Sequence, residues 1–297
     1  GTDKTLSILI DGLKKLEYRG YDSAGVYVND NAGNDYLVKR PGRISNLEAA
    51  LTDDVHGLSG IGHTRWATHG EPNEANAHPQ YSQDNRFYLV HNGVIENYAQ
   101  LKKEYLSGVH FTSQTDTEVI VQLVDKFVVD NHMDTEAAML KVLRLISPDS
   151  SYAFVMIDRE DPETLYVAKN KSPLLVDLGD GYNMVGSDAM SMIKETNKFM
   201  EIDDHELVIV KPDHVLIKDF DGNEKHRDSF TVDMDASAAD KGAYPFYMLK
   251  EIDEQPAVMR NLVQEYFGDK DDPQIDENLI KAMADSDHIY IVGAGTS

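Results

Sequence analysis

Cysteine is absent from the 297 residues, and tryptophan occurs only once, as Trp66. Without cysteine the chain can form neither disulfide bonds nor thiolate metal sites, and it offers no thiol nucleophile. This absence fits a reducing compartment, and we expect the protein to be cytoplasmic. Long apolar runs are also lacking, because stretches such as 119–124 are far shorter than a membrane span. With no secretory signal visible either, we expect no membrane association.

Positive charge is scarce as well. The chain has 28 Lys and Arg residues against 52 Asp and Glu residues, a formal net charge of -24. Such a surface repels phosphate groups, so we expect no nucleic-acid partner. Residues 201–240 alone carry 12 acidic and 4 basic side chains. Their alternating pattern is typical of exposed antiparallel strands, and it favours a solvated acidic face over a functional site.

The hydrophobic pattern predicts helices and antiparallel strands in separate blocks. Helical spacing of apolar residues recurs in several segments, and period-two alternation dominates from residue 152 onward. This arrangement favours an α+β fold of stacked antiparallel sheets flanked by helices. The expected helices are 2–17, 43–51, 95–105, 113–129 and 134–146. The expected strands are 26–28, 36–39, 60–68, 87–91, 152–157, 164–168, 174–177, 184–186, 207–210 and 215–217.

A change of composition predicts a domain boundary near residue 236. Residues 234–242 are small and polar, as in a linker, and helical spacing resumes at 244–266 and 276–283. The chain then ends on an apolar strand and a glycine turn at 288–297. Such a turn is typical of the start of a phosphate-binding α/β domain, although one short turn is weak evidence. The alternative is an edge strand that completes the first domain.

Two predicted strand ends carry polar residues suited to a binding site. The segment GIGHTRWATHG spans residues 60–70, and LVHNG spans residues 89–93. Ile61, His63 and Arg65 alternate along a predicted strand that leads into a loop near Ala67. A buried guanidinium or imidazole must be paired, so these residues suit a site better than a core. The simpler alternative is that they are ordinary turn residues.

The residue types indicate a site for an α-amino acid with a side-chain amide. The planar guanidinium of Arg65 suits a carboxylate, and Asp116, at a predicted helix start, suits an ammonium group. The Asn92 side-chain amide and the Gly93 backbone N–H could together form an oxyanion hole for acyl transfer. The chain lacks a nucleophile for that reaction, because it has no cysteine and no G-x-S-x-G elbow.

Histidine is concentrated near these segments, with five of the eleven between His56 and His91. Their spacing matches no common set of metal ligands, so we expect no metal site. His63 and His91 lie on predicted strands, where hydrogen-bonded core positions are favoured. His69 and His78 lie in predicted loops and are the better site candidates.

Four motifs in order resemble the glutaminase half of the glutamine–fructose-6-phosphate aminotransferase (isomerising) family, also called glucosamine-6-phosphate synthases. They are LEYRGYDSAG from Leu16, HTRWATHGEPNEANAHP from His63, HNGVIENY from His91 and SQTDTE from Ser113. DKGAYPFYMLKEIDEQP from Asp240 resembles that family's linker, and IVGAGTS resembles the start of its sugar isomerase half. The resemblance therefore implies domains at 1–236 and 237–297.

The resemblance implies a class II amidotransferase with the four-layer αββα fold of N-terminal-nucleophile hydrolases. In that family an N-terminal cysteine attacks the side-chain amide of L-glutamine, with its own α-amino group as base. Ammonia then reacts with fructose 6-phosphate in the isomerase half and gives glucosamine 6-phosphate. No cofactor is implied, and a homodimer forms mainly through the isomerase half.

The family's site residues can be placed on matching positions of this sequence. Arg65 resembles the residue that binds the glutamine carboxylate, and Asp116 the one that binds its amino group. Asn92 and Gly93 resemble the oxyanion hole. The remaining residues that the resemblance implies are Trp66, Thr68 and His69 in the glutamine-site loop, Arg19 at the nucleophile end, and His78 as a nearby support.

One departure from the family concerns the nucleophile. The printed chain begins just upstream of the first predicted helix, where the family has a strand that carries the cysteine. We expect the natural protein to have that strand and the isomerase half. Two alternatives stay open: another class II amidotransferase with an acceptor such as phosphoribosyl diphosphate, and a non-catalytic glutamine-binding or regulatory module.

Overall fold

A computed structural model describes residues 2–67, 70–232, 244, 247–267 and 276–290. The chain forms two compact units, Gly1–Asp240 and Lys241–Ser297. The division falls close to the boundary predicted from composition. Each unit is described by itself.

The first unit contains most of the helices and all of the described strands. Its helices are α1 (Thr5–Leu16), the 3₁₀ turn η1 (Glu17–Arg19), α2 (Ile44–Glu48), α3 (Tyr98–Tyr105), α4 (Asp116–Val129), α5 (Thr135–Leu145) and α6 (Ala189–Met192). Its strands are β1 (Ser23–Asn29), β2 (Asp35–Pro41), β3 (Ser59–Arg65), β4 (Gln80–Tyr81), β5 (Phe87–Val94), β6 (Ser151–Asp158), β7 (Asp161–Asn170), β8 (Leu175–Leu178), β9 (Asn183–Gly186), β10 (Lys198–Glu201), β11 (Glu206–Val210), β12 (Val215–Asp219), β13 (Glu224–Lys225) and β14 (Phe230–Thr231).

These strands form three sheets, and every pairing between named strands is antiparallel, as predicted. The largest sheet has the order β13-β12-β11-β7-β6-β5-β4. A second sheet has the order β2-β1-β3, and a third the order β14-β10-β8-β9. Strands β11 and β12 form a hairpin, with Val210 opposite Val215.

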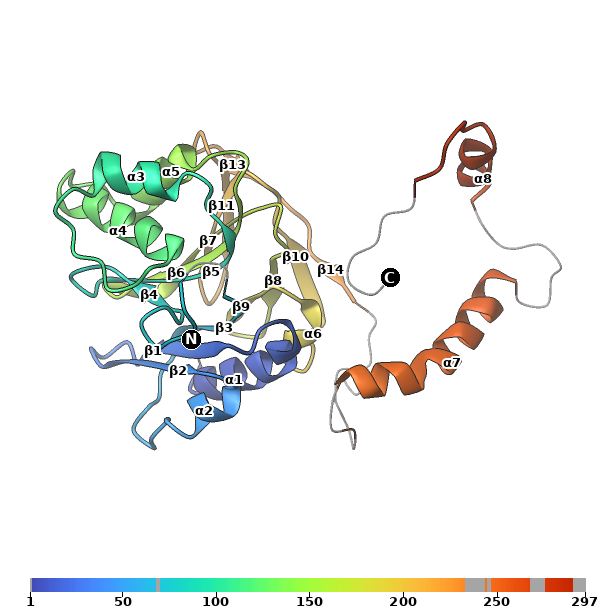
Figure 1. Cartoon of the computed structure of the whole chain (residues 1–297), viewed down its shortest axis with the longest axis horizontal. Coiled ribbons are helices and arrows are strands. Elements are labelled where there is room, and N and C mark those ends of the chain that lie inside the picture. The colour runs from blue at the N-terminus through green and yellow to red at the C-terminus, as the bar shows by residue number, and fades with distance from the viewer. Residues whose placement is uncertain (1, 68–69, 233–243, 245–246, 268–275, 291–297) are drawn as a thin grey trace. The chain divides into compact units, whose positions relative to one another are not determined.

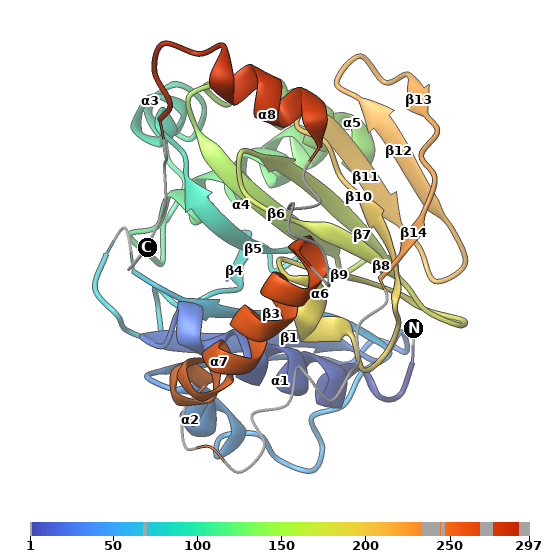
Figure 2. The same ribbon diagram turned by 90° about the vertical axis from the view of Figure 1, so that its right-hand side faces the viewer.

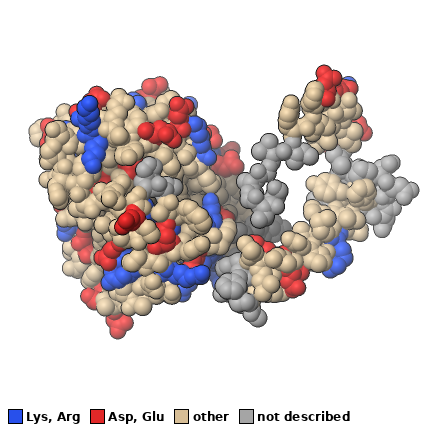
Figure 3. All heavy atoms as spheres, viewed as in Figure 1, with Lys and Arg blue, Asp and Glu red and all other residues tan. Residues whose placement is uncertain are grey.

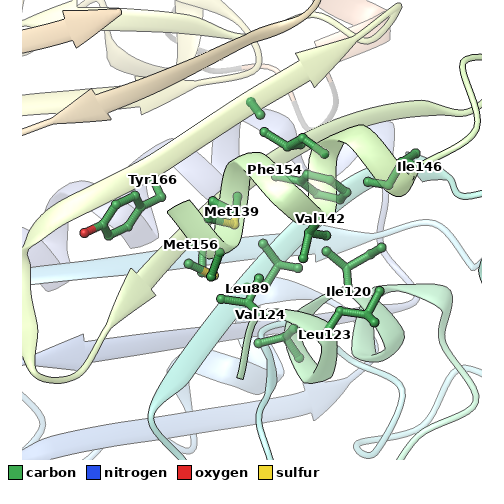
Figure 4. Packing of buried hydrophobic residues seen from close by; sticks show 14 of the residues in the cluster. Leu89, Ile120, Leu123, Val124, Met139, Val142, Ile146, Phe154, Met156 and Tyr166 are labelled. Carbon is green, nitrogen blue, oxygen red and sulfur yellow. The ribbon is translucent and has the colours of Figure 1, made fainter. Parts of the chain in front are cut away.

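Helices α4 and α5 lie beside the largest sheet, and helices α1 and α2 lie beside the sheet that contains β1 (Figures 1 and 2). One face of the largest sheet packs against α4 and α5, where Leu89 and Phe154 meet Ile120 and Met139 (Figure 4). The opposite face packs against the two smaller sheets in a second core. Helices α1 and α2 cover the outer face of the sheet that contains β1. These four layers confirm the predicted αββα arrangement.

Several boundaries differ from the sequence prediction. The strand expected at 60–68 ends at Arg65. The first helix begins at Thr5 rather than at residue 2, after an N-cap, Lys4, that makes no side-chain cap bond. Strands β4, β10, β13 and β14 and helix α6 were not predicted; each has only two to four residues, so its periodicity is weak.

The second unit contains α7 (Tyr247–Tyr266) and α8 (Glu277–Ala284), close to the two predicted helices. Residues 288–290 are exposed and form no strand, which differs from the buried strand expected there. Residues 291–297, with the predicted glycine turn, and most of the predicted linker lie outside the described residues. Among the helices that the structure describes, none is long and apolar enough to cross a membrane.

Acidic and basic side chains are interspersed on the visible face of the first unit (Figure 3). Residues 201–232 of this unit include strands β11 to β14. Within this segment, the side chains of Glu201, Asp213 and Asp228 are exposed. The acidic excess of this segment is therefore largely a solvated surface, as its alternating pattern predicted.

Candidate active site

Two strands from different sheets bring the predicted polar residues together. On β3, Ile61 belongs to the core between the sheets, and alternation places His63 and Arg65 on the same face. On β5, Val90 belongs to that core too, so Asn92 faces the same layer. The imidazole Nε2 of His63 lies 2.7 Å from Asn92 Oδ1, and this bond joins the two strand ends.

A cavity of about 460 Å³ lies where these strands meet. It extends along β3 and β9 and reaches the start of α4. Seven of the predicted site residues line it: Arg19, Arg65, Trp66, His78, Asn92, Gly93 and Asp116. The other two, Thr68 and His69, lie outside the described residues.

Arg65 is held at the end of β3 with only 4% of its surface exposed. Its guanidinium donates to the backbone carbonyl oxygens of Glu71 and Gly70, at 3.3 and 3.4 Å. Burial lowers the pKa of Arg65, and the nearby carboxylates of Asp22 and Asp116 oppose that shift. An arginine stays protonated under these conditions, so the cavity wall carries a fixed positive charge.

Asp116 supplies a negative charge from the first turn of α4, where it is 3% exposed. The preceding residue, Thr115, is the N-cap of α4, and its side chain accepts from the Glu118 backbone N–H. One carboxylate oxygen of Asp116 accepts from the Ile95 backbone N–H at 2.8 Å. This bond ties the start of α4 to the chain that follows β5.

Glu118, which the sequence analysis did not single out, supports Asp116. Its buried carboxylate accepts from the backbone N–H groups of Thr112 and Ser113 at 2.8 and 2.6 Å. These bonds hold the loop that enters α4. The T-x-x-E pattern of Thr115 and Glu118 could have identified it, since a Glu at this position usually satisfies N-terminal amides.

Gly93 occupies a position that no other residue fits. Its φ is +133°, and a Cβ atom there would lie 2.0 Å from the Ser151 carbonyl oxygen. Asn92, immediately before it, is exposed to the cavity. The backbone of β5 can therefore lie close to β6 at Gly93, while the neighbouring Asn92 amide faces the cavity.

The histidines near the cavity are buried, and they are more tightly packed than their loop and strand positions suggested. His63 and His91 are hydrogen-bonded, as predicted: His63 to Asn92, and His91 Nδ1 to Thr117 Oγ1 at 2.9 Å. His78 lies in a loop, as predicted, but it is only 5% exposed, and its ring stacks on that of His63 with centroids 4.5 Å apart. The turn before β4 folds back against β3 and buries it.

The polar segment after α1 lies against the end of β3. Arg19 is 40% exposed and lies 3.9 Å from Asp188, so its charge is only loosely held. Asp22, which the sequence analysis did not assign to the site, donates through its backbone N–H to the Arg65 carbonyl oxygen at 3.1 Å. Its carboxylate accepts from the Ala67 backbone N–H. The segment thus fixes the direction in which the chain leaves β3.

Trp66 follows Arg65 and remains 63% exposed. Its ring meets that of Tyr21 edge-on, with centroids 5.7 Å apart. A large exposed aromatic at a cavity mouth is available to cover a bound molecule. Within the described part of the chain, no group of three His, Cys, Asp or Glu side chains is arranged to hold a metal ion.

The cavity also follows two open sheet edges. Among the described strands, β3 pairs only with β1 and β9 pairs only with β8. The other edge of each strand borders the cavity. Backbone N–H and C=O groups on such edges can pair with a further strand.

Comparison with known proteins identifies the class. A family model described as a glutamine amidotransferase domain matches residues 52–215, more than half of the chain. The chain therefore belongs to the glutamine amidotransferase domain family.

Individual relatives are more specific. The chain is 60% identical over 297 residues to a glutamine–fructose-6-phosphate aminotransferase (isomerizing) of Lactiplantibacillus plantarum, and 54% identical to one of Lactococcus lactis. Each match covers 100% of this chain and 49% of the relative. The chain thus spans about half the length of the curated relatives that it matches.

Solved structures confirm the fold. The glutamine phosphoribosylpyrophosphate amidotransferase of B. subtilis, complexed with ADP and GMP, aligns with a TM-score of 0.62 and 25% identity. That alignment covers 73% of this chain and 47% of the other. A structure described as the allosteric regulatory enzyme of purine biosynthesis aligns over 74% of this chain with a TM-score of 0.64 and 25% identity. The class II amidotransferase fold predicted from the motifs is therefore present.

Proposed function

We propose that this chain binds L-glutamine and hydrolyses its side-chain amide, as the ammonia-supplying half of a glutamine–fructose-6-phosphate aminotransferase. The observation that carries the proposal is the convergence of Arg65, Asp116 and the Asn92–Gly93 pair on one cavity. These residues come from three separate segments, on β3, α4 and β5.

The charges in this cavity match the two ends of a free α-amino acid. Arg65 offers a planar cation that can pair with a carboxylate through two parallel hydrogen bonds. Asp116 offers a buried anion for the ammonium group, and its position is fixed by the Ile95 N–H. A peptide-bound glutamine would lack both free ends. The arrangement therefore favours the free amino acid.

The Asn92–Gly93 pair supports acyl-transfer chemistry at the side chain of that amino acid. Attack on an amide carbon places negative charge on its oxygen, and donors fixed in advance stabilise that charge. Asn92 offers its NH₂ group, because its oxygen already accepts from His63. Gly93 has no side chain to block access to its N–H.

The open edges of β3 and β9 suit a segment that carries the nucleophile. Thr2 N–H donates to the Leu58 carbonyl oxygen at 3.0 Å, so the chain enters beside the Ser59 end of β3. Arg65 is at the other end of this seven-residue strand. At roughly 3.3 Å per residue, about seven extended residues before Thr2 would span β3. An N-terminal cysteine on that segment would then lie near Arg65 and Asn92.

The acceptor of the ammonia belongs to the rest of the protein. The curated relatives are named for fructose 6-phosphate, and the chain covers half of their length. We therefore propose that a following isomerase half uses the ammonia to make glucosamine 6-phosphate. A homodimer formed mainly through that half is part of the same proposal.

Replacing Arg65 tests the role of the cavity. In the full-length protein, R65A should lower kcat/KM for glutamine by about two to three orders of magnitude, as expected when one partner of a buried charge-assisted contact is lost. Sugar isomerisation should be nearly unchanged. The control is R159A, which removes a half-exposed arginine paired with Asp35. Equal loss of both activities in R65A would contradict the proposal.

A second measurement separates the alternatives that the sequence left open. Calorimetric titration with glutamine, beside an assay for glutamate, should show both binding and turnover in the full-length protein. Binding without glutamate formation would identify a non-catalytic module. Glutamate formation with transfer to phosphoribosyl diphosphate, and none to fructose 6-phosphate, would identify the other amidotransferase class.

A further inference from the structure

We propose that His63 is a positioning residue for the oxyanion hole: its Nε2–H holds the Asn92 carbonyl oxygen, so that the Asn92 NH₂ group faces the reacting amide. The inference rests on the proposed function for its kinetic consequence. The hydrogen bond itself is a feature of the cavity that can be tested separately.

The direction of this bond follows from its chemistry. A side-chain amide oxygen can only accept, so the His63 nitrogen 2.7 Å from Asn92 Oδ1 must carry the proton. The amide is planar, and fixing its oxygen on β3 therefore also fixes where its two N–H bonds point. A hydrogen bond accepted by the amide oxygen also polarises the amide and strengthens its N–H groups as donors.

The imidazole of His63 is itself held in place. Its ring stacks on that of His78, with an angle of 30° between the planes. Burial lowers the pKa of His63 to about 4, so the ring is neutral near pH 7. A neutral ring with its proton on Nε2 can donate to Asn92 without placing a second positive charge beside Arg65.

His78 is oriented by a closed set of hydrogen bonds. The His91 backbone N–H donates to His78 Nδ1 at 3.3 Å, so the His78 proton is on Nε2. That nitrogen lies 3.3 Å from Thr117 Oγ1, and the same hydroxyl lies 2.9 Å from His91 Nδ1. The Thr117 hydroxyl can therefore accept from His78 and donate to His91. These contacts assign the proton position of His63 and of His78.

This set links the two parts of the site. Thr117 follows Asp116 on α4, and His91 precedes Asn92 on β5. The carboxylate expected to hold the ammonium group and the amide expected to hold the oxyanion thus share one network of buried imidazole rings. Packing of the rings therefore opposes a displacement of either Asp116 or Asn92. Such packing suits a site that must keep its hydrogen-bond donors in place during the reaction.

The kinetic test uses variants that separate ring packing from hydrogen bonding. H63F keeps a ring against His78 but removes the donor. In the full-length protein it should lower kcat for glutamine hydrolysis by about tenfold, with KM changed less than about threefold, because a misplaced donor weakens mainly the transition state. H63Q, which restores an N–H donor, should recover part of kcat. Sugar isomerisation in the same preparations reports the amount of full-length protein.

A double mutant identifies the partner through which His63 acts. In the N92A background, H63F should lower kcat by less than about twofold, since the donor that it positions is already absent. The same tenfold loss in both backgrounds would overturn the proposal. A change in KM alone, with kcat unaltered in H63F, would also overturn the proposal.

A spectroscopic test does not depend on catalysis. Nitrogen-15 shifts of histidine-labelled full-length protein should show the His63 proton on Nε2 at neutral pH, and N92A should change that signal. A proton on Nδ1 would refute the hydrogen bond. If the wild-type protein releases no glutamate, the proposed function fails, while this measurement still decides the His63–Asn92 contact.

Discussion

The two strand ends that form the site carry similar residues and use them differently. At the end of β3, alternation directs His63 and Arg65 toward the space between the sheets. At the end of β5, His91 packs on the helix side of the sheet, whereas Asn92 faces the cavity. In the proposed function, the β3 end therefore contributes the charge that binds substrate, and the β5 end contributes neutral donors for the reaction. The contacts of a histidine on a strand therefore depend on the face of the sheet to which it points, and not on its neighbours in sequence.

The largest expected effect is at the β5 end, with Gly93→Ala. The added Cβ would lie 2.0 Å from the Ser151 carbonyl oxygen and 2.6 Å from its carbon, so the pairing of β5 with β6 must open. We expect a loss of more than about 4 kcal/mol in the free energy of unfolding, and no glutaminase activity. Urea unfolding of the chain measures the first quantity.

Gly33→Ala is the matched control for this prediction. Gly33 has φ +103° but no atom within 4 Å of the added Cβ, so only backbone strain of about 1 to 3 kcal/mol is expected. Similar losses in the two variants would show that the close approach of β6 does not require glycine at position 93.

Asn92→Ala tests the division of roles between the strand ends. In the full-length protein, N92A should lower kcat for glutamine by about two to three orders of magnitude, because one oxyanion donor is lost, and KM should change little. R65A should instead weaken glutamine binding. Steady-state kinetics and calorimetric titration on both variants give the comparison. An equal loss of glutamine binding in N92A and R65A would contradict separate roles for the two strand ends.

The smallest effect is a pH dependence that comes from the β3 end. Burial depresses the pKa of His63 to about 4, so the unfolded chain binds more protons than the folded chain between about pH 4 and 6.5. The free energy of unfolding should therefore fall as pH is lowered through this window, by up to about 1.4 kcal/mol per pH unit for this histidine.

H63F removes that contribution, so its unfolding free energy should fall less steeply over the same pH range. Urea unfolding of wild type and H63F at several pH values between 4 and 7 measures the two slopes. His78 also has a strongly lowered pKa through burial, and both proteins keep it. Equal slopes would show that His63 is not held neutral by the fold.

The site residues that could be predicted from the sequence are those whose residue type has few chemical roles at such a position. A glycine after Asn92, an arginine at a strand end and a carboxylate at a helix start each have narrow chemical roles, and Arg65, Asn92, Gly93 and Asp116 do line one cavity. Their individual roles remain predictions. The loop position of His78 was predicted but its burial was not, because the irregular segment before β4 gives no periodic sign that it packs against β3. Asp22 and Glu118 were missed; the T-x-x-E pattern could have identified Glu118, whereas the Ala67 backbone amide that Asp22 holds is distant in sequence.

The sequence by itself determined the helices and longer strands, the α+β class and the set of site residue types, because these depend on periodicity and on local side-chain chemistry. The tertiary structure decided which side chains meet. Whether His63 reaches Asn92 depends on the packing of two sheets whose strands are far apart in the chain. The open edges of β3 and β9 and the direction of the Asn92 amide also depend on that packing, since no local pattern encodes a contact between distant strands.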